Sequence, residues 1–227
     1  MIDAGEAPWT SWFTGKDFTS DLTSGHFSRW HQLFQSRRDE PMRILEVGSW
    51  EGRSAVFFAE YFPHGSVTCI DTFAGGPVAH YGAMVDEIAS VEARFDENVR
   101  PYGSRVRKLK TTSILGLGAL QAEGQNFDLI YLDGDHRRDN VLAESLIAWP
   151  MLADQGFLIW DDYKAGRGLP IEERVRQAAD LFLWLRAGEF DELARGAQLI
   201  IRKRRNTKRM WRRRASLLYR NIRNMLR

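Results

Sequence analysis

Six acidic residues stand out in this sequence as candidates for a functional site, because each lies at the end of an apolar run that is typical of a buried strand. In chain order they are Glu46, Asp71, Asp133, Asp135, Asp161 and Asp162. The carboxyl ends of parallel strands converge on one crevice of an open α/β sheet. Several carboxylates in one pocket repel each other unless a cation, a ligand ammonium group or a proton lies between them. We expect a divalent cation, because Asp133, Asp161 and Asp162 offer the hard oxygen ligands that suit Mg²⁺.

Residues 132–136, Leu-Asp-Gly-Asp-His, add a histidine to this group. An isolated Asp161-Asp162 pair would favour another interpretation, in which the first residue caps a turn and the second is solvated. A lone histidine is likewise most often structural or exposed. His136, however, lies three residues after Asp133 and just past a strand, where its imidazole could take a proton from a bound hydroxyl group. We therefore predict His136 and Asp133 as the catalytic residues.

Residues 44–54, Ile-Leu-Glu-Val-Gly-Ser-Trp-Glu-Gly-Arg-Ser, predict a tight turn from a buried strand into a helix. Gly48 and Gly52 tolerate unusual dihedrals and allow a ligand to approach closely, and the helix directs free N–H groups at the turn. The spacing Glu46-x-Gly48-x-x-x-Gly52 fits neither the dinucleotide nor the phosphate-loop motif. About 20 residues on, Asp71 stands where α/β nucleotide folds place a carboxylate for ribose hydroxyls. We expect a ligand with a ribose and no phosphate.

The composition indicates one domain with appendages, since 227 residues with 44% hydrophobic content can bury one sizeable core. The single cysteine, Cys69, excludes an intramolecular disulfide and suits a buried thiol in a reducing cytoplasm. No apolar run approaches the ~18 residues of a membrane span, and the first residues lack the pattern of a secretion signal. We expect a cytoplasmic protein.

Five apolar runs alternate with helical or loop segments, which predicts a parallel sheet. The runs are residues 42–48, 66–71, 105–109, 127–133 and 156–161. Helices are expected at 54–62, at 140–152, within 74–104 and after Pro170. An antiparallel edge pair, 189–194 with 198–202, would complete a Rossmann-like, doubly wound, mostly parallel seven-stranded α/β sheet with helices on both faces.

Three segments organise the chain: an aromatic-rich cap or lid at 1–40, the main domain at 41–202 and a basic tail at 203–227. The aromatic residues of the first segment either pack on the core or form a lid, with His26 or Trp30 touching the substrate. The lid and the core packing remain alternatives at this point.

The tail differs in charge from the rest of the chain. Residues 202–227 contain 12 Lys or Arg and no Asp or Glu, which leaves 20 basic and 30 acidic residues in 1–201. An apolar 4-3-4-3 spacing predicts an amphipathic basic C-terminal helix through Trp211, Ala215, Leu218, Ile222 and Met225. An anionic membrane surface, at the inner face of the cell membrane, is the favoured partner. Nucleic acid phosphates and the acidic body of the protein are the alternatives.

The motifs together resemble the class I S-adenosylmethionine-dependent methyltransferases, and within them the small-molecule O-methyltransferase branch. The resemblance covers residues 40–202 and rests on four motifs in order: 44–56, Asp71, 127–136 and 156–163. It implies that the turn around Gly48 and Trp50 holds the methionine end of the cofactor, with the Ser54 hydroxyl. It also implies that Asp71 holds the ribose. The cofactor-binding set expected in this way is Glu46, Gly48, Ser49, Trp50, Gly52, Ser54, Asp71, Thr112, Ser113 and Asp135.

Two positions depart from the catechol and caffeoyl-type relatives, which usually show Asp-Asn on the last strand and a lysine after the first metal aspartate. Asp162 and His136 occupy these places here. The pattern is more similar to the methyltransferases of macrolide sugars, which favours a sugar or polyol hydroxyl as acceptor. Two other functions remain open: an RNA methyltransferase that uses the basic tail, and a noncatalytic S-adenosylmethionine-binding protein anchored by it. A homo-oligomer is also compatible with the sequence.

Overall fold

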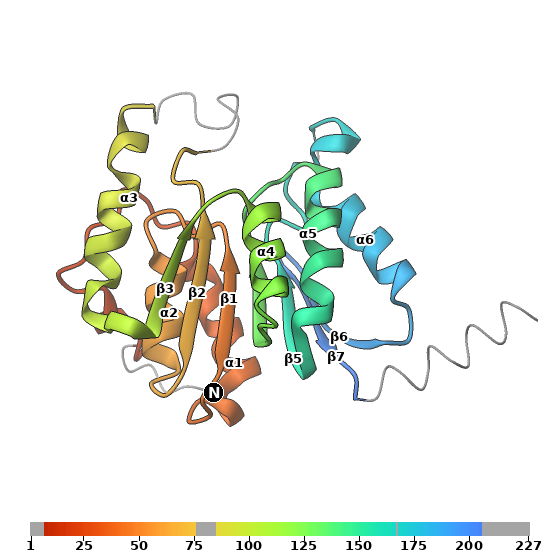
Figure 1. Cartoon of the computed structure of the whole chain (residues 1–227), viewed down its shortest axis with the longest axis horizontal. Helices are drawn as coiled ribbons and strands as arrows, with labels where there is room; N and C mark the ends of the chain where they lie inside the picture. The colour runs from red at the N-terminus through yellow and green to blue at the C-terminus, as the bar shows by residue number, and fades with distance from the viewer. Residues whose placement is uncertain (1–6, 76–84, 167, 206–227) are drawn as a thin grey trace, which may run out of the picture.

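The computed structural model describes residues 7–75, 85–166 and 168–205. Its centre is one seven-stranded sheet in the order β3-β2-β1-β4-β5-β7-β6 (Figure 1). The strands are β1 Arg43–Val47, β2 Ser66–Asp71, β3 Val106–Lys110, β4 Phe127–Leu132, β5 Leu152–Trp160, β6 Phe190–Arg195 and β7 Leu199–Lys203. The first five run parallel, and β7 pairs antiparallel with both β5 and β6. The predicted Rossmann-like sheet and its antiparallel edge pair are confirmed.

Helices cover both faces of the sheet (Figure 1). They are α1 Phe27–Phe34, α2 Arg53–Tyr61, α3 Val85–Val99, α4 Ser113–Ala122, α5 Arg138–Met151 and α6 Val175–Leu185. The first three contribute to one buried cluster and the last three to another, on the opposite face. Because β1 has β2 on one side and β4 on the other, the strand order reverses there, and a crevice is expected at the carboxyl ends of these strands.

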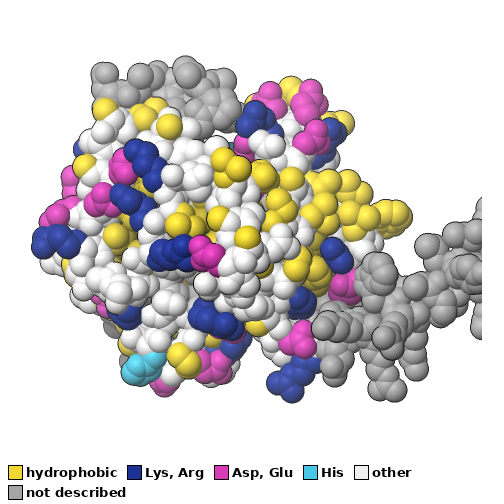
Figure 2. Space-filling model, viewed as in Figure 1, with side chains coloured by type: hydrophobic (Ala, Val, Ile, Leu, Met, Phe, Trp, Pro, Cys, Tyr) yellow, Lys and Arg dark blue, Asp and Glu magenta, His cyan; other side chains and the backbone are white. Residues whose placement is uncertain are grey.

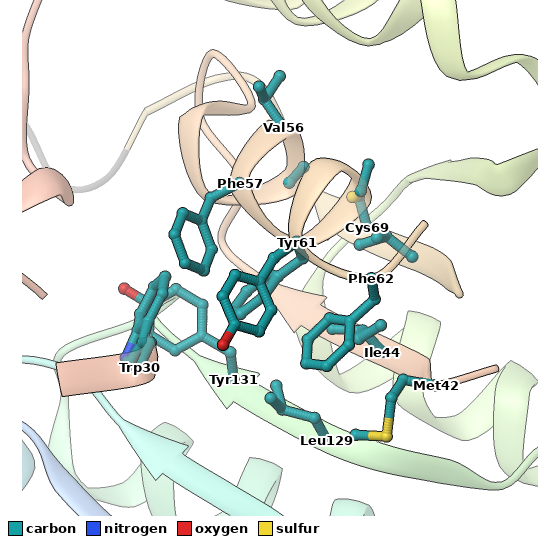
Figure 3. Close-up of a cluster of buried hydrophobic side chains, with 14 of the residues drawn as sticks. Trp30, Met42, Ile44, Val56, Phe57, Tyr61, Phe62, Cys69, Leu129 and Tyr131 are labelled. Carbon is teal, nitrogen blue, oxygen red and sulfur yellow. The ribbon is translucent and has the colours of Figure 1, made fainter. Parts of the chain in front are cut away.

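Alternating side chains of the central strands supply the two halves of the core. Ile44 and Leu129 face the cluster under α1 and α2, whereas Leu45 and Ile130 face the cluster under α4 and α5. Central strands covered on both faces read as near-continuous apolar runs, which is why β4 and β5 could be identified in the sequence. Cys69 is fully buried in the first cluster, as predicted (Figure 3).

Aromatic side chains dominate the first cluster. Trp30 of α1 packs 4.8 Å from the ring of Phe58 and 5.3 Å from the rings of Phe57 and Tyr131 (Figure 3). Its indole N–H donates to the Gln198 side chain at 2.8 Å. The aromatic residues of the N-terminal segment thus anchor it to the core, and Trp30 is wholly buried rather than presented to a substrate. The expectation that Trp30 might touch a substrate is corrected by this packing.

Two differences from the expected elements have local causes. Strand β5 begins at Leu152, four residues earlier than expected, because Leu152 pairs with Phe127 before a register shift in the sheet. Residues 153–155 interrupt the apolar run, so the sequence did not indicate this early start. Helix α4 was not expected, because its apolar residues and two glycines show no helical periodicity. The predicted basic helix of the tail lies outside the described residues. Among the helices that the structure describes, none is long and apolar enough to span a membrane.

Candidate active site

A cavity of about 810 Å³ opens at the carboxyl ends of β1, β2, β4 and β5. Ten of the fourteen predicted site residues line it. They are Gly48, Trp50, Asp71, Thr112, Ser113, Asp133, Asp135, His136, Asp161 and Asp162. The sheet therefore gathers at one rim the side chains that are far apart in the sequence, as the topology predicts.

The two glycines of the β1–α2 turn are both required by the conformation and packing of the protein chain. Gly48 has φ +85°, and a Cβ on it would lie 2.1 Å from the Asp133 carbonyl oxygen. Gly52 has φ +81°, and a Cβ there would lie 2.9 Å from the Phe95 ring. Both positions need glycine for backbone conformation and close packing. The expectation that they admit a ligand is corrected for Gly52, which does not line the cavity, whereas Gly48 does both.

Asp71 holds the turn in place. One of its carboxylate oxygens accepts the backbone N–H groups of Ser49 at 2.7 Å and Trp50 at 2.8 Å. The other accepts the N–H of Phe73 at 2.7 Å. A carboxylate offers about four lone-pair sites, so one remains for a ligand hydroxyl on the cavity side. Trp50 and Phe73 have φ of 47° and 53°, a region that non-glycine residues adopt chiefly at functional sites.

Glu46 lies beneath the turn, fully buried and away from the cavity. Burial raises its pKa to about 7, although hydrogen bonds from Ser54 and Ser49 act in the opposite direction. The thiol of Cys69 approaches the carboxylate at 3.5 Å. Glu46 therefore lies beneath the turn and does not line the main cavity, and its contact with the cofactor stays a prediction. Ser49 and Ser54 border a second cavity of about 40 Å³ instead.

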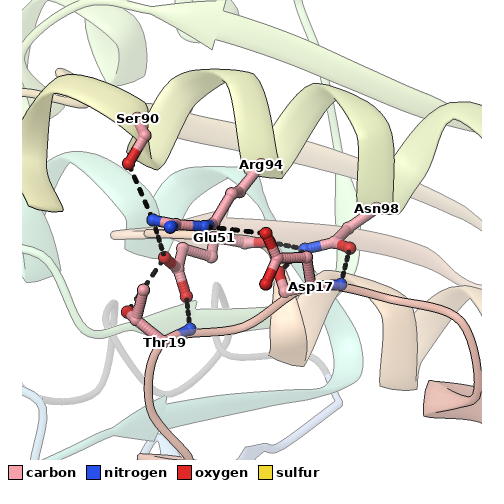
Figure 4. A network of polar contacts seen from close by, with 6 residues as sticks. All are labelled: Asp17, Thr19, Glu51, Ser90, Arg94 and Asn98. Atoms are coloured by element: carbon pink, nitrogen blue, oxygen red, sulfur yellow. Dashed lines mark hydrogen bonds and ion pairs between the residues drawn. The ribbon is translucent and has the colours of Figure 1, made fainter.

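Residues 16–26, here called the strap, line one side of this second cavity. Figure 4 shows the polar contacts that hold the strap in place. The buried carboxylate of Glu51 accepts the Thr19 N–H at 2.7 Å and the Thr19 hydroxyl at 2.9 Å. Arg94 of α3 bridges Glu51 at 3.2 Å and Asp17 at 3.0 Å. Asn98 completes the attachment, because its amide donates to the Asp17 carbonyl and accepts the Asp17 N–H. These contacts dock the strap against the start of α2 and against α3.

The strap carries two side chains into the wall of the main cavity, Leu22 and His26. The His26 ring stacks on Trp30, with 6.1 Å between ring centroids, and its Nε2 lies 3.5 Å from Asp161 Oδ1. The aromatic residues of the N-terminal segment thus pack on the core, and His26 lines the cavity, whereas the lid stays a prediction.

Tyr131 links two of the predicted metal ligands. Its buried hydroxyl lies 2.9 Å from Asp133 Oδ2 and also within hydrogen-bonding distance of Asp161 Oδ2. A phenol has one hydrogen to donate, so the second carboxyl must carry a proton, unless a cation compensates its charge. In agreement, burial and the neighbouring charge of Asp161 raise the pKa of Asp133. The hydroxyl of Tyr131 alone therefore does not balance the negative charge of the Asp133 and Asp161 carboxylates.

His136 joins this acidic group. Its Nε2 lies 3.3 Å from Asp162 Oδ2 and 3.9 Å from Asp133 Oδ1. One ligand atom from each of these three residues lies within 4.8 Å of the others. The hydrogen bond to Asp133 raises the pKa of His136, against the opposing effect of burial. The structure thus brings together Asp133, His136 and Asp162, whereas the carboxylate of Asp161 is directed at Tyr131 and His26.

These residues fit a divalent cation. The carboxylates supply hard oxygen ligands, and the missing positive charge at Tyr131 is what a cation would provide. Asp162 has φ of 52°, so the backbone after β5 adopts an unusual conformation at this rim. Asp161 lies across the Tyr131 hydroxyl from Asp133. It therefore neighbours the clustered residues and stays a predicted metal ligand.

The cavity wall near α4 and α5 is formed by residues at the amino-terminal ends of these two helices. Thr112 and Ser113 lie at the start of α4, and Asp135 precedes α5. The Asp135 carboxylate accepts the N–H of Arg137 at 2.8 Å and the amide of Asn140 at 2.6 Å. These hydrogen bonds hold the loop between β4 and α5, and Asp135 also lines the cavity.

Several functional residues escaped the sequence analysis. Tyr131 lies inside an apolar strand, and only the rule that a buried hydroxyl needs a partner could have marked it. Leu22, Asn140 and Glu51 stand in segments without a motif. Their roles depend on contacts across many residues of sequence, such as the one between Thr19 and Glu51.

Residues 45–163, more than half of the chain, match the model of a family described as a methyltransferase domain. The chain belongs to the methyltransferase domain family. The predicted membership in the class I methyltransferases is confirmed by this match together with the sheet order. No curated protein matches this methyltransferase.

Solved structures with the same fold are distant in sequence. MycE from the mycinamycin biosynthetic pathway, solved with Mg, SAH and mycinamycin VI, is 18% identical with a TM-score of 0.59, over 87% of this chain. This methyltransferase spans 54% of the MycE chain, about half its length. An O-methyltransferase from Bacillus cereus in complex with SAH is 17% identical with a TM-score of 0.60, covering 82% of this chain and 84% of the other. TomG from Streptomyces achromogenes, an O-methyltransferase solved with SAM, is 16% identical with a TM-score of 0.60, covering 81% and 82%.

Proposed function

We propose that this methyltransferase uses S-adenosylmethionine and Mg²⁺ to methylate a hydroxyl group of a small molecule or sugar. The observation that carries the proposal is the cluster of Asp133, His136 and Asp162 at the rim of the main cavity. An acidic group with a histidine inside it suits the removal of a proton from an oxygen. The similarity of fold to O-methyltransferases such as TomG supports the same chemistry.

The cavity suits an adenosyl ligand beside the cluster. Asp71 keeps a lone pair for a ribose hydroxyl, and Thr112 and Ser113 line the wall beyond it. The small cavity under the strap, next to Ser49 and Ser54, suits the methionine end. When bound, S-adenosylmethionine supplies an electrophilic methyl group on a sulfonium. The chain contributes by holding the acceptor oxygen in line with that methyl group.

His136 would take the acceptor's proton while its imidazole is neutral, which its raised pKa of about 9 restricts to alkaline pH. Asp133 and Asp162 orient the imidazole and stabilise it once it is protonated. A bound Mg²⁺ supplies Lewis acidity, which lowers the pKa of an acceptor hydroxyl. Asp133 and Asp162 would hold the ion, with Asp161 beside them. Leu22 of the strap lines one side of the cavity, where its side chain is 69% exposed.

The acceptor side of the cavity favours a neutral, hydroxyl-rich molecule with an apolar part. Small and aliphatic residues line it: Leu22, Ala165, Gly166, Leu169 and Val175. Among the described residues of the cavity wall, Arg137 is the only Lys or Arg, and it pairs with Asp135 at 2.6 Å. Phosphate groups would meet mainly carboxylates, which disfavours RNA as the acceptor. A vicinal diol of a sugar suits the cluster best.

A methyl-transfer assay with S-adenosylmethionine tests the proposal across glycosylated, polyol and catechol acceptors. We expect turnover on hydroxyl acceptors that is lost in EDTA and restored by Mg²⁺. Asp133→Asn and Asp162→Asn should lose the Mg²⁺-dependent turnover, whereas Asp139→Asn, an exposed carboxylate outside the cavity, should keep it. Full wild-type activity in EDTA would overturn the metal, and methylation of RNA alone would overturn the acceptor class. Cofactor binding without transfer to any acceptor would favour a noncatalytic role.

A further inference from the structure

Helix α6 presents apolar side chains on both of its faces. Val175, Ala178, Ala179, Phe182 and Leu183 are buried against the sheet. Leu181, Trp184 and Leu185, here called the α6 stripe, are 41%, 73% and 44% exposed. Residues three and four apart share one face of a helix, so these side chains form a single patch. Figure 2 shows hydrophobic side chains gathered at the right edge of the molecule, where Figure 1 places α6.

An exposed tryptophan between two exposed leucines is unusual for a solvated helix face. A contiguous exposed apolar patch on a protein surface often marks an interaction site. The second apolar face of α6 therefore calls for an occupant.

The described chain ends against the segment that follows α6. Arg204 donates its backbone N–H to the Glu189 carbonyl at 2.9 Å, and its guanidinium pairs with Asp191 at 2.6 Å. Residues 188–189 follow the end of α6 by only a few positions, so the basic tail leaves the body close to Leu185. The tail from residue 206 to 227 contributes eight Lys or Arg and no Asp or Glu.

We propose that the α6 stripe and the basic tail together dock this methyltransferase onto an anionic lipid surface. Tryptophan and leucine side chains insert at the boundary between headgroups and acyl chains, and Lys and Arg bind anionic headgroups. A second copy of the chain would bring two strongly basic tails together, and a nucleic acid has no apolar layer to receive the stripe. An anionic membrane satisfies both features at once.

The placement also relates the surface to the cavity. Val175, the first residue of α6, lines the cavity, and Leu181 follows it by about 9 Å along the helix axis. Because β7 runs antiparallel to β5, the described chain ends at the edge of the sheet opposite the cavity, so the docking surface lies away from the cavity mouth. The docking does not depend on the identity of the acceptor and can be tested without an activity assay.

Vesicle flotation of the full chain tests the proposal. We expect binding to phosphatidylcholine vesicles that contain phosphatidylglycerol, weaker binding at high salt, and little binding to phosphatidylcholine alone. Trp184→Ser should lower the partition coefficient about tenfold, since burial of a large side chain is lost. Trp184→Phe should retain most of the binding. Leu115→Ser, which removes a 67% exposed leucine from α4, is the matched control and should bind as the wild type does.

Equal binding by Trp184→Ser and the wild type would overturn the proposal. Binding that ignores phosphatidylglycerol would also overturn it, because the tail would then play no part. A dimer in size-exclusion chromatography that Trp184→Ser dissociates, without any flotation, would assign the stripe to a second copy instead. Circular dichroism checks that each variant is folded, and Leu181→Ser repeats the test at a second position.

Discussion

At the scale of single residues, the hydroxyl of Tyr131 explains why the acidic rim is stable in a buried position. It lies between Asp133 and Asp161, where one hydrogen must serve two carboxyl groups. The carboxylate that receives no hydrogen from Tyr131 must therefore be balanced by a proton or a cation in the folded protein. His136 supplies part of this positive charge, because its hydrogen bond to Asp133 raises its pKa to about 9.

Replacement of His136 should separate catalysis from cofactor binding. For His136→Gln we expect kcat to fall by about 10²–10⁴, the usual contribution of a general base. The affinity for S-adenosylmethionine, measured by calorimetry, should stay within a few-fold, because His136 lies on the acceptor side. His64→Gln, remote from the cavity wall, is the control. An unchanged kcat in His136→Gln would remove this residue from the mechanism.

Glu144 on α5 should make stability depend on pH. It is almost fully buried, and burial raises its pKa to about 7. Between about pH 4.5 and 7 the folded protein keeps a proton on Glu144 that the unfolded chain releases. The free energy of unfolding should therefore fall as pH rises through this range, by up to ~1.4 kcal/mol per pH unit from this group. In Glu144→Gln the contribution is absent, and urea unfolding at several pH values measures the difference. Parallel pH profiles for the two proteins would contradict the shifted pKa.

At the scale of elements, the turns at the strand ends are set by close contacts between neighbouring segments. The turn after β1 rests against the backbone after β4, and Asp71 of β2 holds it through two N–H groups. The cavity is thus built by contacts among β1, β2 and β4, and its shape does not depend on a ligand.

Substitution of Gly48 should test this close packing. A Cβ at Gly48 meets the Asp133 carbonyl at 2.1 Å, and its φ is +85°. We expect Gly48→Ala to destabilise the fold by about 3 kcal/mol or more, through strain and overpacking. Gly118→Ala in α4, where a Cβ would meet no atom within 4 Å, should instead stabilise by ~0.5–1 kcal/mol. Thermal unfolding compares the two; equal effects would show that the turn relaxes freely.

The strap should loosen when its anchor is weakened. Thr19→Val keeps the shape of the side chain but removes the hydroxyl that donates to Glu51. We expect a loss of ~1 kcal/mol, confined to the strap. Faster amide hydrogen exchange in residues 16–26, with unchanged exchange in β4 and β5, is the expected readout. Thr14→Val, at a hydroxyl outside this network, is the comparison, and faster exchange throughout the sheet would contradict a local effect.

At the scale of the whole molecule, Mg²⁺ should stabilise the fold, because an ion that binds only the folded state adds to its free energy of unfolding. At an ion concentration of 100 times Kd the gain is ~2.7 kcal/mol, or roughly 5–10 °C in Tm for a chain of this size. The shift should disappear in Asp133→Asn/Asp162→Asn and persist in Asp139→Asn. A wild-type Tm that ignores Mg²⁺ would contradict the metal site independently of any activity assay.

The sequence predicted the sheet well because its central strands are apolar and alternate with helices. It also placed the acidic residues at one rim, since that follows from strand direction alone. It could not predict which carboxylates face each other: Asp161 turns towards Tyr131 and His26, and His136 takes its place beside Asp133. Side-chain direction at a strand end depends on contacts such as these, which no spacing rule contains. For the same reason the purpose of Gly52, packed against Phe95, was misassigned.

The strap has a kinetic consequence. Thr19 and Asp17 fasten it across the small cavity beside Ser49 and Ser54, while the large cavity stays open on the side of Leu22. A molecule whose end reaches under the strap must enter before anything occupies the wider space in front of it. Turnover would then follow a compulsory order, with the methyl donor arriving first and its demethylated form departing last.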